Sequence, residues 1–98
     1  METIEKLNEV KVSYFGVLFQ MCILAANTLI AHCQMTKKIE TFINKMFKMA
    51  DGYLTEYSKL PVGAGERLTR NMINNTYENF RKKKEAYAAT AGAQVQQQ

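Results

Sequence analysis

The sequence predicts an all-α protein in which a long helix, a Pro/Gly turn and a shorter antiparallel helix form a helical hairpin with coiled-coil-like packing. Three observations predict this fold. Residues 3–59 contain no proline, and the apolar residues of this stretch recur every three or four positions. Leu60-Pro61-Val62-Gly63-Ala64-Gly65 is the one clear turn signal in the chain. Runs of β-branched residues, from which strands are built, are rare.

The first helix is expected over residues 1–60, with Thr3 as its N-cap. Its apolar seam advances in steps of three and four residues, the pattern of a helix packed along its length on another helix. The seam consists of Leu18, Cys22, Ala25, Leu29, His32, Thr36, Ile39, Ile43, Met46, Ala50, Tyr53, Tyr57 and Leu60. The helix must end before Pro61, because a residue that precedes proline is pushed out of the α region. Residues 61–65 are therefore expected to form the turn.

A second, basic amphipathic helix is expected over residues 66–91, and it is predicted to pack on the second half of the first. Gly92 is expected to end it, which leaves residues 92–98 as a low-complexity tail. The residues predicted to pack in this hairpin are Ile39, Ile43, Met46, Tyr53, Tyr57, Ile73, Phe80 and Tyr87.

The segment from residue 12 to residue 36 is the most apolar part of the chain and contains no formally charged side chain. The second helix is too short to cover it, so we expect a partner outside the chain. Its length approaches the roughly 20 residues that cross a bilayer. Three interpretations stay open: a helix buried in a bundle, a helix adsorbed to a lipid-like surface, and a membrane span. The predicted apolar interaction surface consists of Phe15, Leu18, Phe19, Cys22, Ile23, Leu24, Leu29 and Ile30.

Positive charge is concentrated near the end of the chain, where Arg81, Lys82, Lys83 and Lys84 follow one another. The net charge of the whole chain is +4. We interpret the run as a basic, solvated helical surface, which also complements the negative end of the helix dipole. No nucleic-acid partner is expected, because aromatic residues scarcely interleave with the basic ones and no recognition module is visible.

The residue types needed for catalysis and metal binding are scarce. With one histidine, no glycine-rich phosphate loop and no paired carboxylates, we expect no enzyme and no cofactor. Cys22 and Cys33 are predicted about 16 Å apart on one helix, too far to pair. Together with His32 they lack zinc-ligand spacing, so we expect no metal and reduced thiols. The acidic start of the chain is not that of a secretory signal, and the reduced thiols indicate a reducing compartment.

The order of these parts resembles the phasins, the small proteins that coat bacterial polyhydroxyalkanoate granules. The run from Gln34 to Ile43, Gln-Met-Thr-Lys-Lys-Ile-Glu-Thr-Phe-Ile, is similar to the Gln-x-Thr-x-Lys-apolar run in the first helix of that family. The Pro61 turn, followed by Tyr77, Arg81, Lys83 and Tyr87 at helical spacing, resembles the family's basic second helix. The resemblance covers residues 34–87. It implies a cytoplasmic, oligomer-forming, surface-active protein without an active site, whose partners are the polyester surface and its synthase.

Two functions are therefore expected from the sequence. The first is a phasin-like structural protein that binds a lipid-like or polyester granule surface through its apolar helix. The second is a small accessory or anchoring subunit of a larger protein complex. This complex is membrane-bound if the uncharged segment spans a bilayer. In both, a chain of two long helices buries little core and needs self-association, a protein partner or an apolar surface. The expected location is cytoplasmic, associated with granules or membranes.

Overall fold

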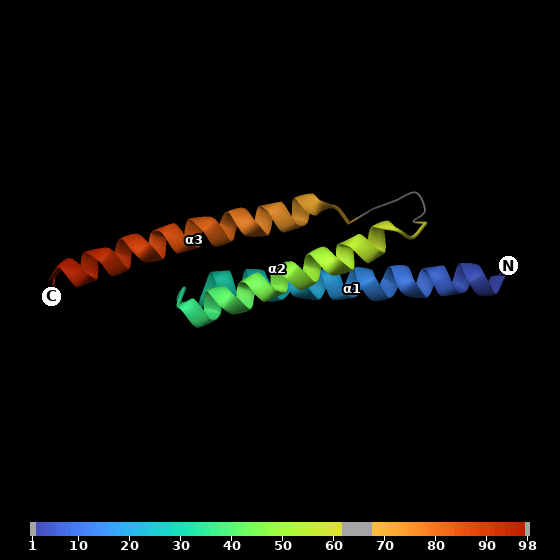
Figure 1. Cartoon of the computed structure of the whole chain (residues 1–98), viewed down its shortest axis with the longest axis horizontal. Helices are drawn as coiled ribbons and strands as arrows, with labels where there is room; N and C mark the ends of the chain where they lie inside the picture. The colour runs from blue at the N-terminus through green and yellow to red at the C-terminus, as the bar shows by residue number, and fades with distance from the viewer. Residues whose placement is uncertain (1, 62–67, 98) are drawn as a thin grey trace.

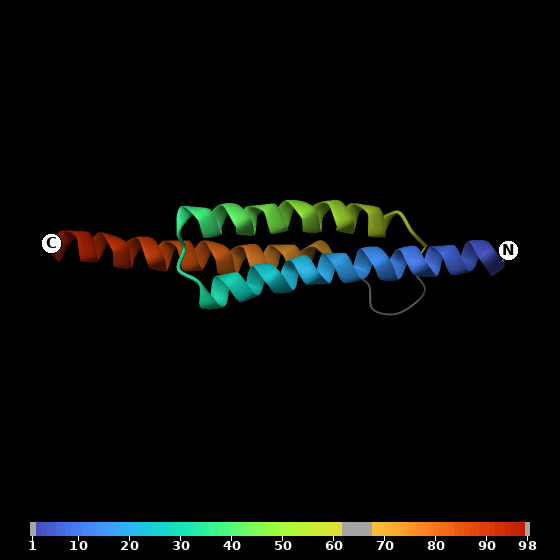
Figure 2. The same ribbon diagram turned by 90° about the horizontal axis from the view of Figure 1, so that it is seen from below.

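The computed structural model describes residues 2–61 and 68–97 and consists there of three α-helices. They are α1 (Glu2–His32), α2 (Lys37–Ser58) and α3 (Arg70–Gln97). Helices α1 and α2 run antiparallel, and α3 returns parallel to α1, in an elongated molecule of 69 × 21 × 17 Å (Figure 1). After a 90° turn, the first part of α3 is seen to lie along the pair that α1 and α2 form, and its C-terminal part projects beyond the α1–α2 loop (Figure 2). The all-α fold class and its helical-hairpin packing are confirmed.

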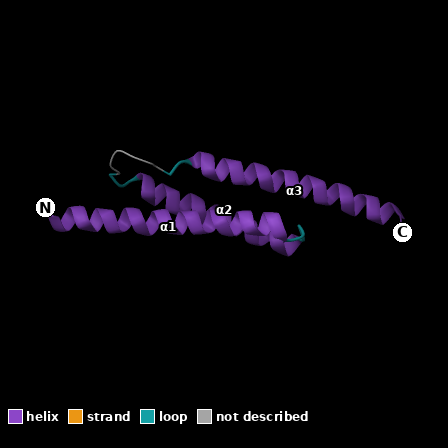
Figure 3. Ribbon diagram, turned by 180° about the vertical axis from the view of Figure 1, so that it is seen from behind, coloured by secondary structure: helices purple, strands orange, loops and turns teal. Residues whose placement is uncertain are grey.

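The extent of the first helix, predicted as residues 1–60, is corrected by a reversal of the chain at residues 33–36. A short loop joins α1 to α2 there (Figure 3). Thr36 has an extended backbone (φ −71°, ψ 161°), and its hydroxyl oxygen accepts a hydrogen bond from the backbone N–H of Ile39 at 3.3 Å. Thr36 is therefore the N-cap of α2, and Glu40 in the first turn complements the positive end of the helix dipole.

The other helix ends agree with the predictions in one place and differ in two. Helix α2 ends at Ser58, before Pro61 as predicted, and the N–H of Lys59 donates to the carbonyl oxygen of Glu56 at 3.3 Å. The rest of the predicted turn lies outside the described residues. Helix α3 begins at Arg70 instead of residue 66, after two non-helical residues. It continues to Gln97 instead of ending at residue 91, because alanine and glutamine are strong helix formers and one glycine costs only about 1 kcal/mol.

The core consists of two clusters that the three helices share. The first lies between the middle of α1, the second half of α2 and the start of α3. It contains Phe19, Cys22, Ile23, Ala50, Leu54, Tyr57 and Ile73. The second lies near the α1–α2 loop and contains Ala26, Ile30, Met35, Ile43 and Phe80. All eight residues predicted to pack in the hairpin lie in these clusters or pack against them.

The uncharged segment has a partner inside the chain, contrary to the expectation that it has none. Because the chain reverses at residues 33–36, α2 folds back along α1 and covers one of its faces. At the edge of the α1–α2 layer, Arg70 of α3 forms an ion pair with Asp51 of α2 at 2.5 Å. The opposite face of α1 is left open.

Candidate interaction surface

Most residues of the predicted apolar interaction surface lie in the interior of the protein. Phe19 is completely buried, Cys22, Ile23 and Ile30 are buried, and Phe15 and Leu29 pack against the core clusters. Leu18 is half-buried. Only Leu24 is well exposed, at 67% of its surface. The predicted surface is thus corrected: it is largely the face that α1 turns toward α2 and α3.

Apart from Ile4 near the start of α1 and Tyr77 on α3, the exposed large apolar side chains of the described residues lie on the other face of α1 and beside it on α2. We call the line on α1 the α1 stripe and define it as Leu7, Val10, Tyr14, Val17, Met21 and Leu24, each of which is 51–67% exposed. These residues follow one another in steps of three and four, so they form one line along the helix. Val17 and Met21 precede the buried Phe19 and Ile23 by two residues each, about 200° around the helix axis. The α1 stripe therefore faces away from the core.

Helix α2 extends this apolar surface near the α1–α2 loop. Phe42 is 51% exposed and lines a shallow hollow together with Met21 and Leu24 of the α1 stripe. Met49 lies one heptad after Phe42, on the same side of α2, and is 44% exposed. The hydroxyl of Thr28, which also lines the hollow, donates to the Leu24 carbonyl oxygen at 2.8 Å, so the helix itself satisfies this polar group.

Charged groups flank the α1 stripe only at its N-terminal end. Three acidic residues and two basic ones lie there in the sequence, Glu2, Glu5, Lys6, Glu9 and Lys11, and no charged residue follows until Lys37. By length and composition, residues 3–32 form a helix that is apolar enough to cross a membrane, and its most apolar stretch of 18 residues has a mean hydropathy of 1.7. One third of that 18-residue stretch is nevertheless buried inside the protein. The α1 stripe is thus free of charge from residue 12 onward, whereas on α2 the exposed Lys45 lies between Phe42 and Met49 on the same side of the helix.

The predicted basic surface on α3 is partly neutralised by its own helix. The guanidinium of Arg81 donates to both carboxylate oxygens of Glu78 and to a carboxylate oxygen of Glu85 at 2.6 Å. The hydrogen bond from Arg81 lowers the pKa of Glu78 below its usual value. The Lys84 ammonium lies 4.3 Å from the centre of the Phe80 ring. Arg81 and Lys84 are thus paired with side chains of their own helix.

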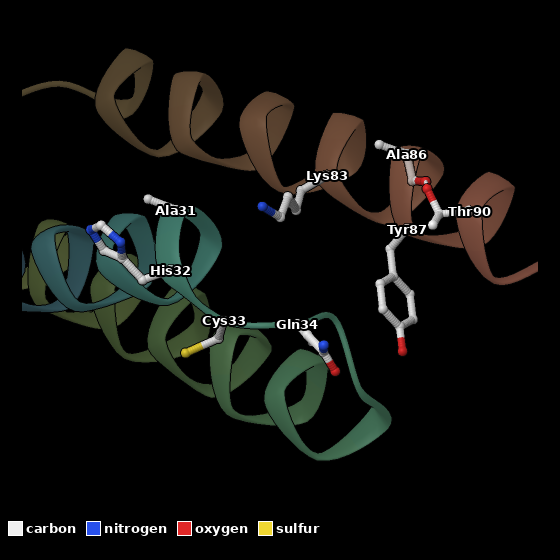
Figure 4. Close-up of a pocket in the computed structure, with 8 residues that line it drawn as sticks. All are labelled: Ala31, His32, Cys33, Gln34, Lys83, Ala86, Tyr87 and Thr90. Carbon is white, nitrogen blue, oxygen red and sulfur yellow. Dashed lines mark hydrogen bonds between the residues drawn. The ribbon is translucent and has the colours of Figure 1, made fainter. Parts of the chain in front are cut away.

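A polar pocket of about 460 Å³ lies where the α1–α2 loop meets α3 (Figure 4). His32, Cys33 and Gln34 line it from the loop side, and Lys83, Tyr87 and Thr90 line it from α3. Figure 4 shows no hydrogen bond between the side chains of these residues, and the Thr90 hydroxyl donates to a carbonyl oxygen of its own helix at 3.0 Å. The pocket therefore presents no assembled pair of nucleophile and base.

The cysteines are free, and they differ in their surroundings. Burial raises the pKa of the Cys22 thiol, which favours its neutral form, whereas Cys33 is half-exposed at the pocket. Among the described residues, no group of three or more histidine, cysteine, aspartate or glutamate side chains is placed to hold a metal ion.

Sequence reasoning missed most of the α1 stripe. Helix α1 carries two lines of apolar residues in steps of three and four. The predicted seam is the line through Leu18, Cys22 and Leu29, which borders the core. The signal for the other line was the equally regular spacing from Leu7 to Leu24. Comparison of the chain with protein-family models, with curated proteins and with solved structures found no match in any of the three.

Proposed function

We propose that the protein is a non-enzymatic interaction protein that adsorbs to an apolar, lipid-like surface through the α1 stripe. One observation carries the proposal: a line of six large apolar side chains stays open to solvent although the core is complete on the opposite face of the same helix. Soluble monomers rarely expose a contiguous apolar patch of this kind without an interaction to make there.

The free energy available from the α1 stripe is sufficient for reversible adsorption. If each side chain withdraws roughly 50 Å² from water, it contributes about 1 kcal/mol. The six side chains of the stripe together then contribute about 6 kcal/mol, which corresponds to a partition of order 10⁴ in favour of the surface. Phe42 and Met49 lie beside the stripe and add to this value.

The nearly charge-free surroundings of the stripe favour a neutral surface over an anionic one. The N-terminal flank carries three acidic and two basic residues, and residues 12–36 carry no charged side chain. Binding is therefore expected to depend little on salt, because no counterions are released and no charges are screened. The resemblance to the phasins supports a polyester granule as the surface.

The test is flotation of the purified protein with emulsified neutral ester and with isolated polyester granules. Val17→Glu places a charge in the middle of the stripe at an exposed position, so it is expected to weaken flotation at least tenfold with the helix content unchanged. Asn44→Glu adds the same charge at an exposed position of α2 outside the stripe and is expected to float like the unchanged protein. Equal flotation of the two variants would contradict the proposal.

The length and hydropathy of α1 favour a second candidate function, an anchoring subunit of a larger membrane-bound complex. In that case α1 crosses the bilayer and exchanges its packing on α2 for lipid or for other helices. Alkaline carbonate extraction of native membranes separates the candidates, because a spanning helix stays in the pellet and an adsorbed protein is released.

A further inference from the structure

We propose that, in water, two copies of the chain pair through their α1 stripes in an antiparallel two-fold contact, and that this dimer releases the stripe when an apolar surface is present. The occupant of the stripe in solution is thus a second copy of the same chain. The competition with a surface rests on the proposed function, whereas the dimer itself does not.

The spacing of the α1 stripe is that of a coiled-coil seam. Leu7, Tyr14 and Met21 occupy heptad position a, and Val10, Val17 and Leu24 occupy position d. In an antiparallel pair of helices each a residue packs in the layer of a d residue of the other helix. The stripe meets this condition when the two-fold axis passes midway between Tyr14 and Val17, because every a residue then lies level with a d residue of the second copy.

The layers of the antiparallel pair follow directly from the residue numbers. Leu7 lies level with Leu24 of the second copy, Val10 with Met21, and Tyr14 with Val17, and each layer is repeated by the two-fold axis. All six side chains of the stripe are thereby used, and the exposed Ile4 lies beside the end of the contact, one turn before Leu7.

Charge selects the antiparallel direction over the parallel one. Lys6 and Lys11 flank the stripe on its two sides, at heptad positions g and e. A parallel pair would place Lys6 of one copy beside Lys11 of the other, twice, and these like charges repel. The antiparallel pair instead brings g beside g and e beside e, so that Lys6 lies next to Asn27 and Lys11 next to Leu18 of the second copy, both uncharged.

The area of the stripe fits a weak and reversible dimer. At half to two-thirds exposure, each of the six side chains offers roughly 100 Å², or about 600 Å² per copy. A stable interface of standard size buries about 800 Å² per partner. The dimer is therefore expected to form at high protein concentration and to dissociate on dilution.

Sedimentation equilibrium of the full chain over a wide concentration range tests the dimer. The unchanged protein and Asn44→Glu are expected to reach twice the chain mass of 11.2 kDa at high concentration. Val17→Glu brings two carboxylates together near the two-fold axis and is expected to stay at 11.2 kDa. An equimolar mixture of Val17→Glu and Val17→Lys is expected to regain the dimer. A monomeric unchanged protein at every concentration, or a Val17→Glu variant that dimerises normally, overturns the inference.

Disulfide crosslinking tests the direction of the pair, in a chain whose half-exposed Cys33 is replaced by serine. Leu7→Cys mixed with Leu24→Cys is expected to give a crosslinked heterodimer on mild oxidation. Leu24→Cys alone is expected to give little crosslink, because the two cysteines lie near opposite ends of the contact. Efficient crosslinking of Leu24→Cys alone would show a parallel pair and overturn the antiparallel geometry.

Neutral-ester droplets added to the dimer then separate this inference from the proposed function. A dimer that binds droplets and loses its Leu7–Leu24 crosslinking there supports both. A dimer that does not bind droplets leaves the pairing standing and contradicts the proposed function. A protein that floats with droplets but never dimerises in water contradicts the pairing alone.

Discussion

Replacement of Thr36 by alanine tests the chain reversal that separates α1 from α2. In the structure the Thr36 hydroxyl oxygen accepts the N–H of Ile39 at 3.3 Å, and loss of an N-cap acceptor costs about 1 kcal/mol. If residues 1–60 formed one continuous helix instead, the same change would stabilise the protein by up to about 0.7 kcal/mol, because alanine is the better helix former. The two arrangements therefore predict effects of opposite sign.

The measurement is the free energy of unfolding from urea titrations followed by circular dichroism. For a chain of this size a loss of about 1 kcal/mol lowers Tm by roughly 4–8 °C. Thr36→Asp keeps a capping oxygen and is expected to be close to the unchanged protein. Thr41→Ala is the matched control, because the Thr41 hydroxyl donates to the Lys37 carbonyl oxygen at 2.9 Å within α2, where alanine is favoured. A Thr36→Ala variant as stable as Thr41→Ala would refute the reversal at residues 33–36.

Three further changes follow from the packing. Gly52→Ala is expected to raise the free energy of unfolding by about 1 kcal/mol, since Gly52 lies in mid-helix and an added Cβ meets no atom within 4 Å. A lower free energy of unfolding in urea titrations would contradict this placement of Gly52. Phe80→Ala is expected to lower it by about 3–5 kcal/mol, and Phe80→Leu by less, because this ring is completely buried; a smaller loss for alanine than for leucine would show that α3 is not docked. A thiol reagent at mildly alkaline pH is expected to label Cys33 well before Cys22, because burial shields Cys22 and raises the pKa of its thiol. Since that pKa lies above its unfolded value, Cys22 makes the protein less stable as the pH rises past the unfolded pKa, and Cys22→Ala is expected to lack this dependence.

Local rules predicted the end of α2 but not its beginning. Pro61 forbids the preceding residue a helical backbone, so the end of the helix near Ser58 followed from one residue. The reversal at residues 33–36 has no proline or glycine, and the seam continues in step through His32, Thr36 and Ile39. The available signal was Thr36, a capping residue that is followed by two lysines and Glu40. It marks the start of a helix within a segment whose apolar spacing is helical throughout.

The candidate surface depended on this same reversal. Composition identified the uncharged segment of the chain as the part that meets something apolar. It did not indicate which side of the helix remains open, because α1 is apolar on two opposite sides. Folding α2 back on α1 decides between them: it buries Phe19 and Ile23 and leaves Val17 and Met21 in solvent.

A fluorophore sensitive to polarity, attached to Met21→Cys, tests most directly whether the α1 stripe is the interaction surface. The same label on Asn44→Cys is the control on the exposed side of α2, and both variants carry Cys33→Ser. At protein concentrations low enough for the monomer, added neutral-ester droplets are expected to shift the emission at position 21 to the blue and to leave position 44 unchanged. No shift at either position, or an equal shift at both, would contradict the assignment of the stripe as the binding surface.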